Sequence, residues 1–390
     1  MVDRGPTDGP GNRKPYPCAG RPSGMEGTLD GDVVRVAGDA RQRFHDARGY
    51  GRPVGGNEIE LAPVEAAHLL SRDDLDAVVA DDGRRLDFRG LLARSGAPLA
   101  FVVYKDLRDR GFYLSPAREA WLGPDAAAAV EGTDADFVVY PRGSGPGDGE
   151  VAHRVRVLGE RDRVAVADLG GATLAVVDED GDLTYFETGT PTLAGDAAYD
   201  PPADLDATLF PDRVLLWDPP EAVYERGFYG QRLGGRNAEG GPLQLSLIEA
   251  AHLARRGVLT LDGAADDDAA TDDVTTVDDP EAAVVGRGRA VEDRFDRRLR
   301  VYEALRAAGT VPKSGFKFGA DFRVYESFTS VSELDHSDSL VRVVDPDHAA
   351  LPRDLSLDVR LAGGVRKRMV FALPDANGGI DWLSVARLTP

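Results

Sequence analysis

The spacing of apolar residues predicts short strands and amphipathic helices in the second half of the chain. An apolar run at 213–217, ended by Asp218–Pro220, is typical of a strand. Residues 243–256 have helical periodicity up to Gly257, which predicts a helix. A second helix is predicted from Val291 to the C-cap Gly309, with an apolar stripe at Phe295, Leu299, Tyr302 and Leu305.

Further apolar or alternating runs follow this second helix and predict a sheet. They lie at 321–325, 339–344, 368–373 and 380–385, with Pro, Asp, Asn and Gly residues between them. Between the two helices, residues 262–281 carry nine acidic side chains and no basic one, so we expect a solvated linker there. The second half should therefore be a helix-and-sheet module of mixed class.

An internal repeat organises the whole sequence. The segment PVEAAHL at 63–69 recurs as LIEAAHL at 247–253, and ADFVVY at 135–140 recurs as ADFRVY at 320–325. Weaker matches lie around these segments in the same order. We therefore interpret the chain as a tandem duplication, whose halves of about 180 residues are each long enough for two small domains.

The charge composition indicates adaptation to high salt. The chain has 67 acidic and 46 basic side chains, and only five of the basic ones are Lys. Carboxylates stay hydrated in concentrated salt, whereas the long apolar stems of Lys are avoided there. The Debye length at molar salt is about 3 Å, so the net charge of -21 does not exclude a nucleic-acid partner. The last 90 residues, with 11 basic and 12 acidic side chains, are nearly neutral.

Composition excludes several classes of protein. The lone Cys18 excludes a disulfide framework and a Cys-based zinc site. No apolar stretch approaches the roughly 18 to 20 residues of a membrane span, so no membrane partner is expected. Walker, dinucleotide-binding and His-Glu-x-x-His motifs are missing, so neither a cofactor nor a metal is expected. Residues 1–24 are rich in Gly and Pro, which predicts a disordered leader, and Met25 could be the true start.

The two copies differ in the residues that could do chemistry. In the second copy, His336 follows Tyr325 by 11 residues and Lys367 follows His336 by 31. The first copy keeps Tyr140, but its His register falls near Glu150 and no basic residue follows in the register of the Lys. We interpret the first copy as having lost its chemistry while keeping its fold. Because Lys is so scarce, Lys367 is a candidate for a role that Arg cannot fill.

The other His residues are expected to be structural. His68 and His252 occupy matching places in a predicted helix, where a partly buried structural His is the commoner case. His45, His153 and His348 lie in polar stretches without partners at metal-ligand spacing. His336 therefore remains as the catalytic candidate.

A Tyr, a His and a Lys that converge could cleave a phosphodiester without a metal ion. An imidazolium can donate a proton to a leaving oxygen near neutral pH. A Lys ammonium can neutralise the charge of a pentacoordinate phosphate transition state. A phenol, with an ordinary pKa of about 10, needs a neighbouring cation to act as a base. RNA suits such a site because its 2'-hydroxyl can serve as an internal nucleophile.

These residues resemble the catalytic domain of the archaeal tRNA-intron splicing endonucleases. The resemblance rests on VYEALR at 301–306, GFKFGADFRVYE at 315–326, His336–Ser337 and the run from Val359 to Arg368. The ordered Tyr, His and Lys at this spacing are more specific than any one of these segments. Weaker similarity extends over the first half of the chain as a degenerate copy.

The resemblance implies an α+β, or mixed α/β, tandem duplication. Each half would join a small N-terminal α+β domain to a catalytic-type domain related to restriction endonucleases. The predicted segments are a leader at 1–24, an N-terminal domain at 25–93, an inactive catalytic-like domain at 94–190, a linker at 191–205, a second N-terminal domain at 206–262, an acidic linker at 263–290 and the active domain at 291–390.

The resemblance also implies an activity. The family cuts precursor tRNA at both splice sites of a bulge-helix-bulge without metal, which leaves a 2',3'-cyclic phosphate and a 5'-hydroxyl. Tyr325 would be the general base, His336 the general acid and Lys367 the transition-state stabiliser. Arg360 and Trp382 match the positions that pinch a bulge base, where each stack is worth about 1 to 3 kcal/mol.

The two-repeat form of the family implies a homodimer with two active sites. Together with the salt-adapted composition, the resemblance implies a cytoplasmic protein from a haloarchaeon. The acidic loop that docks on the partner chain in the family would fall near Gly159–Asp162, which is not strongly acidic, so that contact stays open. One alternative is a non-catalytic RNA-binding or structural subunit, in which the three residues need not converge. Another is a metal-dependent nuclease, but the Asp/Glu-x-Lys tripeptide that it requires is missing.

Overall fold

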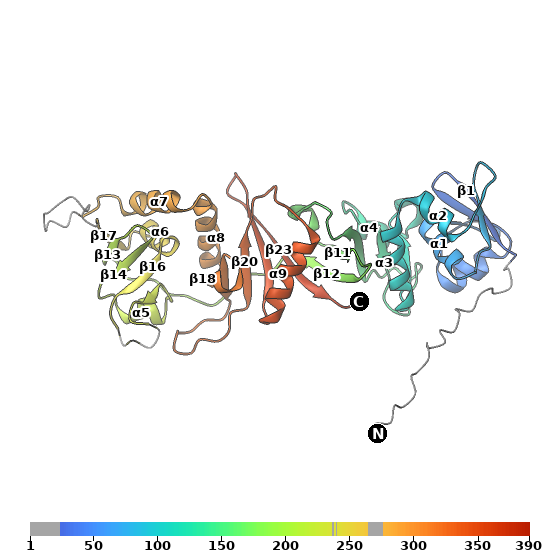
Figure 1. Cartoon of the computed structure of the whole chain (residues 1–390). Helices are drawn as coiled ribbons and strands as arrows, with labels where there is room; N and C mark the ends of the chain where they lie inside the picture. The colour runs from blue at the N-terminus through green and yellow to red at the C-terminus, as the bar shows by residue number, and fades with distance from the viewer. Residues whose placement is uncertain (1–23, 236–237, 239, 264–275) are drawn as a thin grey trace, which may run out of the picture. The chain divides into compact units, whose positions relative to one another are not determined.

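The computed structural model describes residues 24–235, 238, 240–263 and 276–390. The chain divides into two compact units, one made of residues up to 158 with 177–183, and the other of residues 159–176 with 184–390. Figure 1 shows that both contain helices packed on sheets. The predicted leader at 1–24 lies outside the described residues except for its last position.

The first unit begins with a six-stranded sheet in the order β3-β4-β2-β1-β5-β6. β1 pairs antiparallel with β2 and parallel with β5. The strands are β1 (Glu26–Asp30), β2 (Val33–Val36), β3 (Arg52–Gly55), β4 (Glu58–Leu61), β5 (Ala77–Val79) and β6 (Arg85–Leu86), and the helices are η1 (Arg41–Asp46), α1 (Pro63–Ser71) and α2 (Phe88–Ser95).

The rest of this unit is a helix followed by a three-stranded antiparallel arrangement in the order β9-β8-β7. Its elements are α3 (Pro98–Asp109), β7 (Leu114–Pro116), η2 (Glu119–Trp121), α4 (Pro124–Val130), β8 (Phe137–Val139) and β9 (His153–Gly159). α3 packs against α1, so a helix of each domain meets at their junction.

The second unit contains a copy of the first sheet. Its order, β15-β16-β14-β13-β17, matches β3-β4-β2-β1-β5, and β13 likewise pairs antiparallel with β14 and parallel with β17. This agreement confirms the predicted duplication at the level of strand topology. The elements are β13 (Leu205–Leu209), β14 (Arg213–Leu216), α5 (Glu221–Glu225), β15 (Gln231–Arg232), β16 (Leu243–Ser246), α6 (Leu247–Arg255) and β17 (Leu259–Gly263).

The structure corrects the start of the helix predicted at 243–256. Residues Leu243–Ser246 are strand β16, which pairs with β14, and the helix α6 begins only at Leu247. Ser246 ends the strand and caps the helix, because its Oγ accepts a hydrogen bond from the backbone N–H of Glu249. The difference arises because the apolar residues of the strand and of the helix that follows it form one nearly periodic run in the sequence.

The predicted acidic linker at 263–290 is partly wrong. Residues 264–275 lie outside the described residues, but Pro280–Val291 form helix α7, which packs on α6. Asp279 caps this helix by accepting a hydrogen bond from the N–H of Ala282 at 2.9 Å, and Pro280 follows at the first helical position. Gly288 allows a close approach, since a Cβ there would meet the Phe295 ring at 2.2 Å. The sequence did not predict α7, because the helix has few buried apolar residues and follows a strongly acidic segment.

The catalytic-type domain of the second half contains the predicted helix and the four predicted strands. The sheet of this unit has the order β18-β19-β20-β22-β23-β12-β11, with β20 and β22 parallel. The elements after α7 are α8 (Phe295–Ala307), β18 (Val311–Ser314), η4 (Phe316–Phe318), β19 (Phe322–Tyr325), β20 (Ser339–Val343), β21 (Ala349–Ala350), α9 (Pro352–Gly364), β22 (Arg368–Pro374) and β23 (Ile380–Leu388).

The last strands of the two repeats pair with each other. β12 (Leu183–Gly189) runs antiparallel to β23, with Tyr185 opposite Leu388 and Gly189 opposite Ser384. The remaining elements from the first repeat are β10 (Val164–Ala165), η3 (Val166–Leu169) and β11 (Thr173–Val177). Residues 190–204 contain no helix or strand, whereas Leu205, the last residue of the linker predicted at 191–205, is the first residue of β13.

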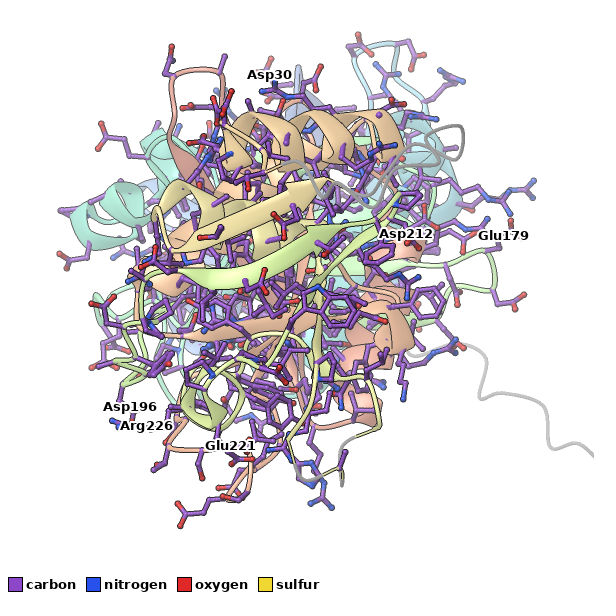
Figure 2. The ribbon with its side chains drawn as sticks, turned by 90° about the vertical axis from the view of Figure 1, so that its left-hand side faces the viewer. Asp30, Glu179, Asp196, Asp212, Glu221 and Arg226 are labelled. Carbon is purple, nitrogen blue, oxygen red and sulfur yellow. The ribbon has the colours of Figure 1, made fainter. Side chains whose placement is uncertain are left out.

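The two faces of this sheet are covered by different helices. Leu299, Tyr302 and Leu305 of α8 share a buried core with Val370 and Ala372 of β22. α9 covers the opposite face, where Leu355 lies beside Phe371 and Asp358 pairs with Arg342. On the surface, Figure 2 shows acidic side chains such as Asp30, Glu179, Asp212 and Glu221 projecting from the ribbon, as expected for a salt-adapted protein.

Candidate active site

Tyr325 is the last residue of β19, between β18 and β20. Its strand neighbour Val324 pairs with Ser339 of β20, and Tyr325 itself lies opposite Val311 of β18. The side chain is 4% exposed, and its ring centroid lies 5.9 Å from that of Phe228 in the second N-terminal domain. The phenol is thus fixed by packing at the end of a strand.

His336 lies in the connection that leads back from β19 to β20, and its side chain is exposed. Two hydrogen bonds of Asp338 anchor this connection. Its N–H donates to the carbonyl oxygen of Val324 at 2.8 Å, and its carboxylate accepts from the N–H of Glu326 at 2.8 Å. His336 is therefore only two residues from Asp338, which is hydrogen-bonded to the residues on both sides of Tyr325.

Lys367 lies in the turn between α9 and β22. Its N–H donates to the carbonyl oxygen of Ala362 at 2.9 Å, after Arg366 adopts a left-handed φ of 57°. Its Nζ donates to the carbonyl oxygen of Ser337 at 2.5 Å. Burial and the charge of Arg323 lower the pKa of Lys367, and the Asp338 carboxylate opposes this shift.

The parallel pairing of β20 and β22 explains why Lys367 lies beside the segment that carries His336. Ser339 lies opposite Arg368 at the start of both strands, so the residues that precede the two strands are neighbours. The structure thus brings Lys367 to the backbone beside His336, while Tyr325 ends the adjacent strand β19. These three positions, defined here as the catalytic edge, come from three separate segments of the chain.

Arg323 lies beside the catalytic edge and is absent from the candidates that the sequence offered. Its Cζ lies 5.9 Å from the centroid of the Tyr325 ring, and its charge acts on Lys367. Its buried Nε has no hydrogen-bond partner within the described part of the chain. The signal was present, because Arg323 and Tyr325 are two residues apart and share one face of β19. The first copy has Val138 at the equivalent position.

The first copy has no equivalent of the catalytic edge. The N–H of Ala152 donates to the carbonyl oxygen of Val139 at 2.8 Å, just as Asp338 bonds to Val324. Counting back from this bond places Glu150 at the position of His336, as the sequence predicted. The residue before β11 is Ala172, whereas Lys367 precedes β22.

Arg360 and Trp382 are not brought together within one chain. Arg360 is exposed on α9, which covers one face of the sheet. Trp382 lies opposite Ala372 on β23 and packs against the core on the other face. Their joint role in holding a base remains a prediction.

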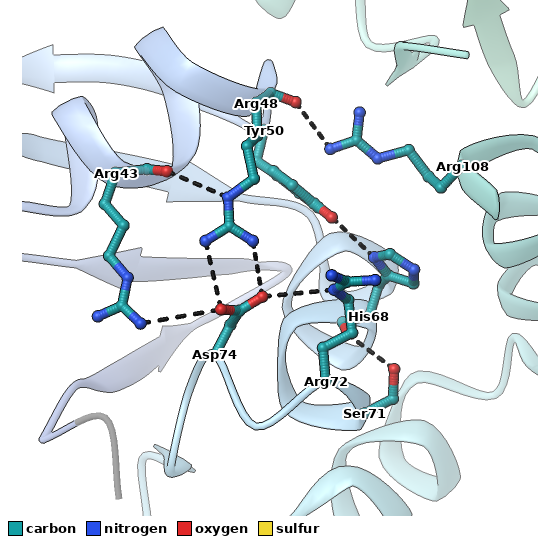
Figure 3. Close-up of polar contacts among 8 residues, drawn as sticks. All are labelled: Arg43, Arg48, Tyr50, His68, Ser71, Arg72, Asp74 and Arg108. Atoms are coloured by element: carbon teal, nitrogen blue, oxygen red, sulfur yellow. Dashed lines mark hydrogen bonds and ion pairs between the residues drawn. The ribbon is translucent and has the colours of Figure 1, made fainter. Parts of the chain in front are cut away.

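His68 and His252 occupy equivalent buried clusters. The ring of His68 contacts Tyr50, whose hydroxyl lies 2.8 Å from its Nδ1, as Figure 3 shows. Burial and the nearby Arg108 lower the pKa of His68 to about 4, and burial with Arg306 does the same for His252. Both imidazoles are therefore neutral packing groups at pH 7, as expected for structural His residues.

The described residues contain no group of three or more His, Cys, Asp or Glu side chains arranged to hold a metal ion. Within the same part of the chain, no helix is long and apolar enough to cross a membrane.

Comparison with known proteins identifies the family of this chain. Residues 295–382 match the tRNA intron endonuclease catalytic C-terminal domain, and residues 25–92 and 205–274 both match the tRNA intron endonuclease N-terminal domain. The tRNA-splicing endonuclease of Haloferax volcanii is 65% identical over 367 residues, which cover 94% of this chain and 100% of the relative. The tRNA-splicing endonuclease of Haloarcula marismortui is 54% identical over 369 residues, which cover 94% of this chain and 100% of the relative. The tRNA-splicing endonuclease of Methanosarcina acetivorans is 35% identical over 383 residues, which cover 93% of this chain and 99% of the relative. The chain belongs to the tRNA-splicing endonuclease family.

Proposed function

We propose that this protein excises introns from precursor tRNA by cutting both splice sites of a bulge-helix-bulge. The observation that carries the proposal is the hydrogen bond from the Lys367 ammonium to the carbonyl oxygen of Ser337. This bond places the Lys367 ammonium, a cation suited to binding phosphate, beside the backbone of the residue that follows the exposed His336. The relatives named above, each called a tRNA-splicing endonuclease, support the choice of substrate.

The reaction would be an internal transfer of the phosphodiester. Tyr325 accepts the proton of the 2'-hydroxyl, and O2' attacks the phosphorus. The bond from phosphorus to O5' breaks, and His336 donates its proton to that oxygen. The products are a 2',3'-cyclic phosphate and a 5'-hydroxyl, with no water consumed and no metal needed.

Charge at the catalytic edge supports these roles. Lys367 and Arg323 form no ion pair with a carboxylate of the described chain, although the protein as a whole is strongly acidic. One N–H of the ammonium is used by Ser337, so two remain for the oxygens of the pentacoordinate phosphate. The Arg323 guanidinium adds a second cation at this place, with its Cζ 5.9 Å from the centroid of the Tyr325 ring.

The activity is tested with a bulge-helix-bulge RNA in molar KCl and EDTA. We expect two cuts, with upstream fragments that end in a cyclic phosphate and downstream fragments whose 5'-hydroxyl is labelled by polynucleotide kinase. A requirement for added magnesium would contradict the mechanism. Binding without any cut would instead support a non-catalytic RNA-binding subunit.

We also propose that the chain acts as a homodimer with one catalytic edge per protomer. Excision needs two cuts, and only the second copy of each chain carries Tyr325, His336 and Lys367 together. Two chains would thus supply the two sites. A precursor-tRNA substrate would place the protein in the cytoplasm.

A further inference from the structure

Phe316 is exposed in a way that its surroundings do not explain. Its side chain is 87% exposed, compared with 57% for Leu233, the next among the large exposed apolar side chains of the described residues. Concentrated salt strengthens the association of apolar groups, so a bare aromatic ring is a liability on a salt-adapted surface. A ring kept at this position therefore indicates a partner that covers it.

The turn that carries Phe316 is closed by its own backbone. The N–H of Phe318 donates to the carbonyl oxygen of Gly315 at 2.8 Å, and the N–H of Gly315 donates to that of Asp321 at 3.1 Å. Gly319 ends the turn with a φ of +68°, which side chains other than Gly rarely adopt. The ring is thus presented from a defined backbone, which lowers the entropic cost of binding.

The same turn adjoins the catalytic edge. The Lys367 Nζ lies 5.8 Å from the centroid of the Phe318 ring, two residues along the turn from Phe316. Lys317, between the two rings, is exposed and forms no ion pair within the described residues. An exposed ring beside two cations suits a nucleotide, which combines an aromatic base with a phosphate.

The inactive copy provides an internal comparison. The connection between β7 and β8, which corresponds to that between β18 and β19, also carries a one-turn helix with an aromatic residue, Trp121. Two guanidinium groups cover this ring, with the Cζ of Arg118 at 4.8 Å and that of Arg52 at 5.4 Å from its centroid. The aromatic residue is covered in the copy without a catalytic edge and bare in the copy that has one.

We infer that Phe316 is a stacking platform for one unpaired base of the RNA, adjacent to the phosphate that is cut. The inference rests on the proposed function and adds a contact to it. Stacking loses little strength in salt, whereas phosphate contacts weaken steeply, so such a platform suits recognition at molar salt.

The test measures binding of full-length protein to a bulge-helix-bulge RNA with 2-aminopurine at each bulge position in turn. The His336→Ala background prevents cutting, and Phe316 is changed to Ala, Leu or Trp in it. We expect Phe316→Ala to weaken binding by about 5- to 150-fold, the loss of one stack. Phe316→Leu should weaken it similarly, and Phe316→Trp should preserve it. One 2-aminopurine should be quenched by protein with Phe316 or Trp but not with Ala or Leu.

Leu233→Ala is the matched control, because it truncates another exposed apolar side chain and should leave binding and quenching unchanged. Normal binding and quenching with Phe316→Ala, alongside cutting by the parent protein, would overturn this inference alone. Loss of the oligomer in light scattering, with RNA binding unchanged per chain, would identify the ring as a protein contact and also overturn it. If the parent protein neither binds nor cuts the RNA, the proposed function fails and the inference fails with it.

Discussion

The ammonium of Lys367 is held by a backbone carbonyl and forms no ion pair with a carboxylate of the described residues. A carboxylate partner would neutralise the charge that the transition state needs, whereas the carbonyl oxygen of Ser337 orients the group and leaves its charge. Burial and Arg323 lower its pKa, so the ammonium is less stable than that of an ordinary Lys. Its protonation is therefore sensitive to the charges that surround it.

Arg323→Met should move the basic limb of the pH–rate profile to higher pH. Lys367 acts as the charged ammonium, so activity is lost as pH rises through its pKa, and removing the Arg323 charge raises that pKa. Single-turnover cleavage rates between pH 7 and the alkaline limit of RNA stability measure the shift. Arg342→Met is the control, since Arg342 pairs with Asp358 and should leave the limb in place. A limb that stays or moves to lower pH in Arg323→Met would be inconsistent with this coupling.

The sequence could place Tyr325, His336 and Lys367 near the ends of strands, because each residue ends or shortly precedes a predicted strand. The environment of Arg323 could not be predicted, since a guanidinium inside a strand pattern gives no sign of whether a carboxylate faces it. Trp382 shows the same limit, because strand periodicity places it on one face of the sheet without saying which helix covers that face.

At the scale of elements, the junction of α6 with β18 contains a buried ion pair that the first copy lacks. Lys313 of β18 donates to Glu249 of α6 and to the carbonyl oxygens of Phe228 and Gly230. Burial raises the pKa of Glu249, but Lys313 outweighs this and holds it below its ordinary range. The equivalent Glu65 has no Lys partner among the described residues, and burial raises its pKa to about 7. The strand register places Ser115 at the position of Lys313.

Lys313→Met should destabilise the protein by about 3 to 5 kcal/mol at pH 7 to 8, because Glu249 would remain buried without its partner. The pKa of Glu249 should then rise as that of Glu65 does. If the folded-state pKa of Glu249 exceeds its unfolded value, the variant loses stability as pH rises through that range. The loss of stability caused by Lys313→Met should therefore become smaller as pH falls toward 5. Guanidinium unfolding in constant high salt at several pH values measures it. The double variant Lys313→Met/Glu249→Gln should recover stability and lose the pH dependence, and a defect of the single variant that is constant with pH would refute the explanation.

Sequence patterns predicted β14, β19, β20, β22 and β23 in the second half, but neither its other strands nor the helix α7. In the run at 368–373, the residues from Met369 to Leu373 are continuously apolar, which indicates burial on both faces of the strand. In α7 the buried contacts are Val284, Val285 and Gly288, and a Gly gives no hydrophobic signal. The burial of Lys313 could not be predicted either, because its partner Glu249 lies 64 residues earlier in the sequence.

At the scale of the whole molecule, the two copies share a fold but differ at the proposed catalytic positions. Both copies keep the junction cluster around His68 or His252, with Arg108 or Arg306 stacked on a Tyr ring. Only the second copy has the catalytic edge. The pairing of β12 with β23 then gives the first copy a structural role, because it extends the sheet of β19, β20 and β22.

Co-expression of intact and His336→Ala chains should separate the two cuts. If one chain supplies one site, random pairing gives intact dimers in proportion to the square of the intact fraction. Intron release should follow that square, while mixed dimers should accumulate RNA cut once. Gel analysis of products against the chain ratio, with dimer mass from light scattering, measures this. His252→Ala chains provide the control, since His252 contacts Tyr302 in the core and should change stability without producing once-cut RNA. Release that falls linearly with the intact fraction would show that a single site makes both cuts.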